Sequence, residues 1–482
     1  MQKYLESSFF YRFISAIYSW LGSQWRASRV LGRFLAPGRG EIASEVSIFA
    51  RAWQGFHRGL CFLFEKLRLN RLLRGSILTM PFIWSFATLV LAPLLPTMAV
   101  FAMTLVSAAS LILAFACDRE RVLTYSPANK YILIYALVYI VATFTSVYVS
   151  GSLFGGALTT LFVLFAIVLQ ASIKTRRQLD AIIYAFVISG AVVSAYGVFQ
   201  YVFGTTLGAS AWLDSEMFSD IGARVYSTFG NPNVLAKYLL LVIPFAGACV
   251  FVVKGGFKKL FFIGCLGAML LCMVLTFSRG GWLGLVAAAA VFFVMLDRRF
   301  IIIGIIGLVV LYFALPDVIL DRFLSIGNVA DTSTSYRVSI WLGTIAMLRD
   351  FWFTGIGPGT AAFNSIYPLY SFNTAAAQHS HNLFLQLVCD AGIVGLIVFL
   401  VLIFAFLRNL CRAVSTERDK NSKIFQLAAL SSVFGFLVQG LTDHSFYNFR
   451  VTFVFWAVIG LGAAIARRST YEDAQCEVPS ID

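Results

Sequence analysis

The chain alternates between long apolar runs and short polar connections along most of its length. A run of ~20 apolar residues is long enough for a helix to cross a bilayer, and a soluble fold could not cover so many of them. Hydrophobic residues make up 59% of the chain and charged residues only 12%. We therefore expect an all-α, polytopic integral membrane protein with about twelve transmembrane helices. The expected spans are residues 77–94, 97–117, 131–148, 154–172, 181–203, 233–253, 260–277, 281–296, 300–316, 382–407, 424–441 and 451–466.

Basic residues set the expected orientation, because Lys and Arg beside spans are retained in the cytoplasm. With the amino terminus inside, every even-numbered connection is basic, as in residues 174–177 and 254–259. The formal charge of +14 is then mostly a belt that faces the membrane lipids of the inner leaflet. It gives no reason to expect nucleic acid as a partner.

Three parts are expected along the chain. Residues 1–76 mix aromatic and basic residues without an uninterrupted span, which favours amphipathic helices on the anionic inner leaflet; recruitment of a partner is the alternative. Residues 77–466 form the membrane domain, which includes a large extracytoplasmic loop over residues 317–381. Residues 467–482 form a cytoplasmic tail.

Two features bear on processing and on redox chemistry. The start of the chain lacks the pattern of a cleavable signal, so we expect it to remain in the mature protein. The eight cysteines show no CxxC spacing, and none falls in an expected outside connection. This distribution speaks against a disulfide framework and against a zinc site.

The basic residues expected outside are all arginines. A planar guanidinium grips phosphate oxygens with two donors, so the lack of lysine among them favours a phosphate site. Arg279, in FSRGGW between two closely spaced spans, is expected to contact a ligand, with interfacial snorkelling as the alternative. For Arg337, a solvated helix face or an ion pair with Asp331 is an equal alternative to a functional role. The outside arginines are Arg224, Arg279, Arg322, Arg337, Arg349 and Arg450.

Three of the four histidines, His379, His381 and His444, are also expected outside. His381 and Asn382 open the helix of the tenth span, where the positive end of the helix dipole favours a neutral imidazole that can accept a proton. A neutral histidine near arginines suits deprotonation of a hydroxyl beside a phosphorylated leaving group. His379 precedes the helix and is the weaker candidate, as support for its neighbour. Capping or packing is the alternative for either residue.

Charged residues within the expected spans are rare. Asp390 lies nine residues beyond His381, which is ~13 Å along one straight helix and too far for contact. We expect it to form a structural ion pair with Lys237 or to be a protonated, hydrogen-bonded acid. Asp443 and His444 lie at the outer end of the eleventh span, and a role for them in orienting His381 is left open.

These motifs together resemble the O-antigen ligase and polymerase superfamily of bacterial envelope glycosyltransferases. His381, Asn382, nine residues, Gly392, two more and Gly395 are similar to its signature H-[NSQ]-x9-G-x-x-[GTY]. The segments STFGNPN, FSRGGW, SYRVSIW and GIGPGT are similar in order and in placement. The resemblance covers roughly residues 180–465. Asp390 departs from it mildly, because many members have a glutamate there.

The resemblance implies a class C glycosyltransferase-like fold in the bacterial cytoplasmic (inner) membrane, with both termini cytoplasmic and the active site extracytoplasmic. It implies transfer of a glycan from an undecaprenyl-pyrophosphate-type donor, that is a polyprenyl-pyrophosphate-linked glycan, to a hydroxyl of a glycan, lipid or protein acceptor. No metal and no other cofactor is implied, and no DxD cluster falls in an expected outside loop.

Site residues follow from the same motifs. By motif, Arg224 and Arg279 would hold the pyrophosphate and His381 would be the catalytic base. Arg337 matches a loop position, and we include it with His379 among the expected substrate-binding residues.

Two other function classes are weighed against this one. A transporter or flippase of lipid-linked glycans would also need arginines near phosphate, but it normally carries ionisable groups at midmembrane, often in repeated halves. A structural scaffold for envelope assembly would make the outer polar residues replaceable. The motifs do not separate a ligase from a polymerase.

Overall fold

The structure is a computed structural model that describes residues 16, 48–67, 76–119, 121, 126–204, 224–297, 299–314, 316–325 and 332–476. The regular secondary structure of these residues is entirely helical. Nine of the described helices are long and apolar enough to cross a membrane. They are α8 (Thr97–Cys117), α10 (Val149–Ser172), α11 (Arg176–Val202), α12 (Pro232–Val252), α13 (Gly256–Leu275), α14 (Arg279–Leu296), α19 (Leu383–Thr416), α20 (Lys420–Gly440) and α21 (Phe449–Cys476).

Three shorter apolar helices stand where further spans were expected. They are α7 (Met80–Leu91), α9 (Asn129–Phe144) and α15 (Phe300–Ala314). The expected all-α, multi-pass membrane fold is confirmed. The count of twelve spans stays a prediction, because each of these three helices is shorter than the ~20 residues that a straight crossing requires.

Only part of the expected amino-terminal region is described. The helix α5 (Ile48–Lys66) packs on the end of α8, where the side chains of Trp53 and His57 contact the Phe115 ring. Apart from Ala16, Leu67 and Ser76, which begins the short helix η2 (Ser76–Leu78), the rest of residues 1–76 lies outside the described residues. The division into three parts stays a prediction.

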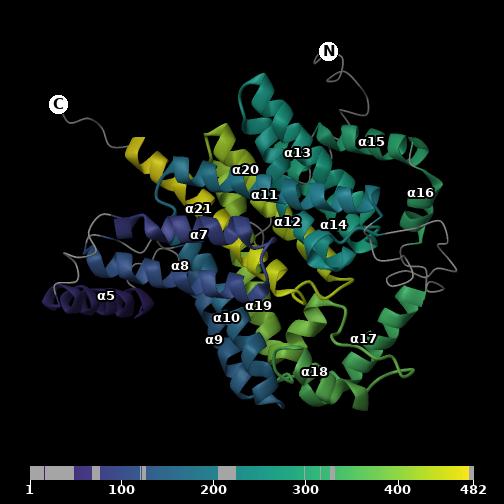
Figure 1. Ribbon diagram of the computed structural model, residues 1–482, viewed down its shortest axis with the longest axis horizontal. Helices are drawn as coiled ribbons and strands as arrows, with labels where there is room; N and C mark the ends of the chain where they lie inside the picture. The colour runs from purple at the N-terminus through teal and green to yellow at the C-terminus, as the bar shows by residue number, and fades with distance from the viewer. Residues whose placement is uncertain are drawn as a thin grey trace.

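The expected large loop contains several helices of its own. They are α16 (Asp317–Leu324), α17 (Thr332–Phe351), α18 (Thr360–Ile366) and η5 (Tyr367–Leu369). Figure 1 shows α17 and α18 together at one end of the molecule, where α18 contacts α10 and α17 contacts α19. The loop is therefore packed on the helix bundle beside the start of α19.

Arg450 links several of the segments that connect helices on one side of the bundle. Its guanidinium donates to the carbonyl oxygens of Pro93 (3.3 Å) and Thr228 (2.8 Å), which joins the α7–α8 connection to the short helix η4 (Ser227–Phe229). At the other ends of the helices, Arg176 pairs with Asp419 at the starts of α11 and α20. This grouping agrees with the alternation of connections expected from the sequence.

The helix α19 is broken inside the expected signature, ten residues after its capping Asn382. Gly392 has φ +65°, in the left-handed region that favours glycine. The segment after α17 satisfies the backbone groups at the break, since the N–H of Ile356 donates to the Cys389 carbonyl (2.6 Å) and the N–H of Ile393 donates to the Trp352 carbonyl (2.8 Å). The signature glycine therefore joins α19 to the large loop.

We predict that Gly392→Ala destabilises the protein by more than about 1 kcal/mol, because alanine disfavours this φ and its Cβ would collide with the Phe353 carbonyl. The measurement is the thermal unfolding midpoint of the purified protein in detergent. Gly267→Ala is the matched control, since Gly267 lies in α13 and a Cβ there meets no atom within 4 Å. Equal midpoints for Gly392→Ala and the parent would contradict the prediction.

Candidate active site

Polar caps fix where three site helices begin. Asn231, Ser278 and Asn382 cap α12, α14 and α19 by accepting hydrogen bonds from backbone N–H groups of the first turn. Arg279 is therefore the first residue of α14, and His381 immediately precedes the cap of α19. The capping residues explain why both side chains stand at helix ends instead of within the spans.

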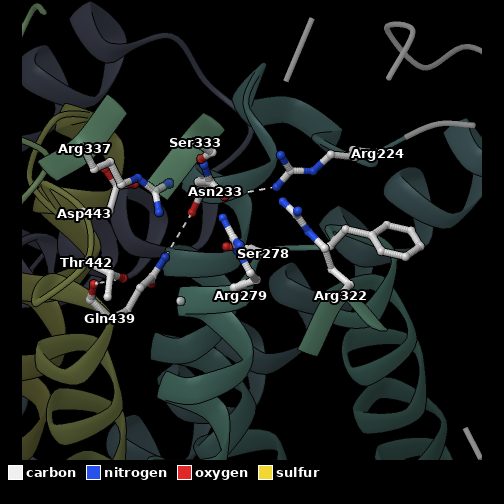
Figure 2. Close-up of a pocket in the computed structure, with 12 residues that line it drawn as sticks. Arg224, Asn233, Ser278, Arg279, Arg322, Ser333, Arg337, Gln439, Thr442 and Asp443 are labelled. Carbon is white, nitrogen blue, oxygen red and sulfur yellow. Dashed lines mark hydrogen bonds between the residues drawn. The ribbon is translucent and has the colours of Figure 1, made fainter. Parts of the chain in front are cut away.

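A cavity open to solvent lies at the starts of α12 and α14, beside the end of α20, and is lined by guanidinium groups (Figure 2). The three arginines expected to bind substrate come together here, and Arg322 joins them from the last turn of α16. The arginines of the cavity are Arg224, Arg279, Arg322 and Arg337. The other lining residues are Asn233, Phe277, Ser278, Gly280, Ser333, Gln439, Thr442 and Asp443.

Arg224 is almost fully buried at this cavity, with 4% of its surface exposed. Its Nε donates to the Thr276 carbonyl (2.8 Å) and its Nη2 donates to Oδ1 of Asn233 (3.1 Å). Burial, together with the positive charges of three neighbouring arginines led by Arg322, lowers the pKa of the Arg224 guanidinium to about 9. The guanidinium stays charged at neutral pH, and a bound polyanion would stabilise that charge.

Arg279 is held inside the protein. Its Nη1 donates to the carbonyl of Ser325 (3.1 Å) and to Oγ of the same residue (3.2 Å), and its Nη2 donates to Oγ1 of Thr334 (3.4 Å). Only 8% of its surface is exposed. A snorkelling arginine would extend its guanidinium into water, so this geometry favours the expected ligand-contacting role over the snorkelling alternative.

The two other arginines that were expected outside do not line the cavity. Arg349 is exposed near the end of α17. Arg450 donates to backbone carbonyls and its guanidinium carbon lies 4.7 Å from the centre of the Phe229 ring. The expected Arg337–Asp331 pair cannot be compared with the structure, because Asp331 lies outside the described residues.

His381 is held in a turn just before α19. Its φ of +48° is unusual for a residue with a Cβ, and its backbone is fixed on both sides. Its N–H donates to Nδ1 of His379 (3.2 Å), and its carbonyl accepts a hydrogen bond from Nε1 of Trp341 in α17 (3.2 Å). The imidazole is half-buried, and its Nδ1 lies 3.1 Å from Oδ1 of Asp443.

Lys237 corrects an expectation, because it pairs with Asp443 and not with Asp390. Its Nζ lies 2.7 Å from Oδ2 of Asp443 and donates to the His444 carbonyl (2.9 Å). The sequence correctly placed Lys237 and Asp390 in two different helices, but it could not show whether the two side chains lie at the same depth. Lys237 lies one turn into α12 and therefore meets the loop after α20, whereas Asp390 lies two turns into α19.

Asp390 has uncharged partners instead. Its Oδ1 accepts a hydrogen bond from Nε2 of Gln386 (2.9 Å), and its Oδ2 accepts one from the Tyr139 hydroxyl of α9 (3.2 Å). These hydrogen bonds agree with the second expected possibility, that Asp390 is a hydrogen-bonded acid. No cavity-lining residue is among these partners, so Asp390 lies outside the candidate site.

Two histidines pack beside His381. The centre of the His379 ring lies 4.1 Å from that of His381 and 5.3 Å from that of His444. Burial, with neighbouring histidine charge, lowers the pKa of His379 well below its usual range, and burial with the Lys237 charge lowers the pKa of His444 to about 3. Both rings are therefore neutral at pH 7. The structure brings His379 to His381 but not to the arginine cavity.

One group of described residues has the geometry to hold a metal ion. Ligand atoms of His379, His381 and Asp443 all lie within 4.8 Å of one another. The ammonium group of Lys237 already contacts this carboxylate, and positive charge so close disfavours a bound cation. The expectation of no metal stays a prediction.

Asp443 connects the two halves of the site. It lines the arginine cavity, where Figure 2 shows it beside Arg337, and its carboxylate also contacts His381. Asp443 was mentioned from the sequence only as an open possibility, and Arg322 only as one of the outside arginines. The arrangement joins polyanion-binding groups to a half-buried imidazole that can accept a proton.

Comparison with known proteins gives two matches. Residues 264–400 match the family model described as O-Antigen ligase, a segment that includes Arg279, Arg322, Arg337 and His381. The chain is also 27% identical over 262 residues to the exopolysaccharide production protein ExoQ of Rhizobium meliloti (strain 1021). That alignment covers 49% of this chain and 58% of the relative, so the chain spans little more than half of the relative's length.

The matched family segment includes three of the four cavity arginines and the whole H-N-x9-G-x-x-G signature. The expected resemblance to the O-antigen ligase and polymerase superfamily is confirmed by these two matches, the first of which covers residues 264–400.

Proposed function

We propose that this protein joins a glycan from an undecaprenyl-pyrophosphate-type lipid donor to an acceptor hydroxyl, as a ligase or polymerase of a cell-surface polysaccharide. The observation that carries the proposal is the convergence of four arginines on one cavity whose Asp443 also contacts His381. The family match and the similarity to an exopolysaccharide production protein support the same reaction class.

In this proposal the arginine cavity binds the diphosphate of the donor. As the bond between the anomeric carbon and the phosphate oxygen breaks, the electron pair leaves with the diphosphate and its negative charge increases. Arg224, Arg279 and Arg337 stabilise that charge through their paired donors, with Arg322 as a fourth member of the set. The proposal needs no metal ion, because the guanidinium groups supply the positive charge.

His381 acts as the general base. The neutral imidazole takes the proton of the acceptor hydroxyl while the hydroxyl oxygen forms its bond to the anomeric carbon. His379 contacts His381 through Nδ1 and supports this position of the ring. A role for His379 in substrate binding would require the acceptor to reach beyond the cavity that the arginines line.

The site faces the extracytoplasmic side in this proposal, and both termini face the cytoplasm. The basic connections on the opposite side of the helix bundle support this orientation. The ionisable side chains of His381, Asp443 and the cavity arginines lie at or near helix ends, and Lys237 contacts Asp443 from the first turns of α12. A transporter would be expected to carry such a cluster near midmembrane, so the geometry favours the transferase over the flippase.

We predict that His381→Ala lowers the rate of glycan joining in proteoliposomes by about 10²–10⁴-fold, because the acceptor hydroxyl loses its base. The measurement is the rate of product formation from donor lipid supplied on the outer leaflet. Asn364→Ala, an exposed position of α18, is the control and should match the parent.

Two further readouts make this prediction specific. The His381→Ala protein should accumulate to the parent level, and donor-lipid export in cells should continue. Product of normal yield and length from His381→Ala would remove the catalytic assignment. Loss of donor export in that variant would point to the flippase.

Arg279→Lys is predicted to lower activity by about 10- to 100-fold, because an ammonium keeps the charge but loses the bidentate donors. The comparison is with Arg349→Lys, an outside arginine that does not line the cavity and should keep activity near the parent. If both variants were as active as the parent, Arg279 would not bind the diphosphate.

Deletion of the gene separates the two forms of the proposal. A polymerase joins the glycan to another repeat unit, so its loss should shorten a surface polymer. A ligase joins finished glycan to a lipid or protein, so its loss should leave full-length unattached glycan. The measurement is the size distribution of surface and lipid-linked glycan in the deletion strain.

A further inference from the structure

Asp443 is held in place by a buried ammonium group. Nζ of Lys237 lies 2.7 Å from Oδ2 of Asp443, and 2% of the lysine side chain and 10% of the aspartate side chain are exposed. The same ammonium donates to the His444 carbonyl. One oxygen of the carboxylate is therefore committed to a fixed partner from α12.

The other oxygen faces the proposed base. Oδ1 of Asp443 accepts a hydrogen bond from the His444 N–H (2.9 Å) and lies 3.1 Å from Nδ1 of His381. Burial alone would raise the pKa of the Asp443 carboxyl, but Lys237, His381 and Arg337 outweigh it and hold the pKa well below its usual range. An ionised carboxylate only accepts hydrogen bonds, so Nδ1 of His381 is the atom that carries the proton.

We infer that Asp443, fixed by Lys237, is a positioning residue that selects the His381 tautomer with its proton on Nδ1 and a free lone pair on Nε2. This inference rests on the proposed role of His381 as the base. Nε2 then takes the acceptor proton, the acceptor oxygen bonds to the anomeric carbon, and the diphosphate leaves with the electrons of its bond to that carbon. The imidazolium that forms remains beside the Asp443 carboxylate.

The charged groups near His381 include one carboxylate in contact with its ring, that of Asp443. His379 packs against the His381 ring, and the His444 and Tyr447 rings pack against His379. Lys237 from α12 and Arg337 from α17 act on the Asp443 carboxylate that contacts His381. The lysine and the arginine are cations, and the two histidines are neutral at pH 7 for the reasons given above. Asp443 is therefore the anion among these groups, and its carboxylate contacts His381 directly.

Asp443→Asn tests the inference with little change of shape. We expect kcat for glycan joining to fall by roughly 10- to 100-fold with a small change in KM, because the amide can stabilise the wrong tautomer and does not stabilise the imidazolium. The acid limb of the kcat/KM profile should move to lower pH. In a His381→Ala background, Asp443→Asn should cause no further loss, because it acts through the absent ring.

A direct measurement on His381 separates this inference from the proposed function. Diethylpyrocarbonate modifies unprotonated imidazole, and mass spectrometry of the 378–382 region reports the extent of modification at each pH. The pH of half-maximal modification of His381 should fall by about one unit or more in Asp443→Asn. This shift is expected even if no glycan is joined, and an unshifted value would overturn the inference even if joining were normal.

Two more variants guard against a merely structural effect. Asp390→Asn alters another buried carboxylate that lies outside the site, and it should leave the His381 modification profile at the parent value. Should Asp443→Asn fail to fold, the double variant Lys237→Met with Asp443→Asn removes both buried charges together and should show the same shift. A parent-like profile in that double variant would overturn the inference.

Discussion

The buried ion pair between Lys237 and Asp443 is the interaction on which the site depends. It joins α12, the helix that follows the Arg224 segment, to the turn between α20 and α21. Removing one partner of such a pair costs about 3–5 kcal/mol, because the other charge is left buried without compensation. The pair costs desolvation energy, so packing alone does not explain its presence. The role inferred for Asp443, an ionised carboxylate fixed beside His381, would explain it.

Rigid helix ends supply the rest of the geometry. His381 and Arg279 flank capping residues, so the start of α19 and the start of α14 fix their backbones. The break of α19 at Gly392 then lets the segment after α17 bond directly to the helix. Because α17 also carries Arg337 and Trp341, the H-N-x9-G pattern links the position of the imidazole to that of the cavity. The spacing of the signature therefore has a physical reason in this fold.

Much of the fold could be predicted from the sequence, because apolar runs of bilayer length and basic connections act locally. The expected span at residues 97–117 coincides with α8. Lengths near the threshold were harder to judge, since α7, α9 and α15 are shorter than a straight crossing requires. Hydropathy does not report how a short helix tilts or packs.

The site was predictable only as a set of residue types on one side. The motifs selected Arg224, Arg279 and His381, but Arg322 had no pattern of its own beyond being an outside arginine. Pairing between distant segments failed for a clear reason: Lys237 and Asp390 were matched as the two charges within spans, without knowledge of their depth. Asp443, in a short connection, carries no periodic signal, and only the packing of α12 against α20 brings it to Lys237.

The choice of cation at each position follows from what that cation contacts. Lys237 meets a single carboxylate oxygen and a carbonyl, for which a compact ammonium suffices. Arg450 differs from the four cavity arginines, because its two terminal nitrogens donate to the carbonyls of Pro93 and Thr228. Of the arginines expected outside, four line the cavity, whereas Arg450 bridges loops. A composition pattern alone could not have distinguished them.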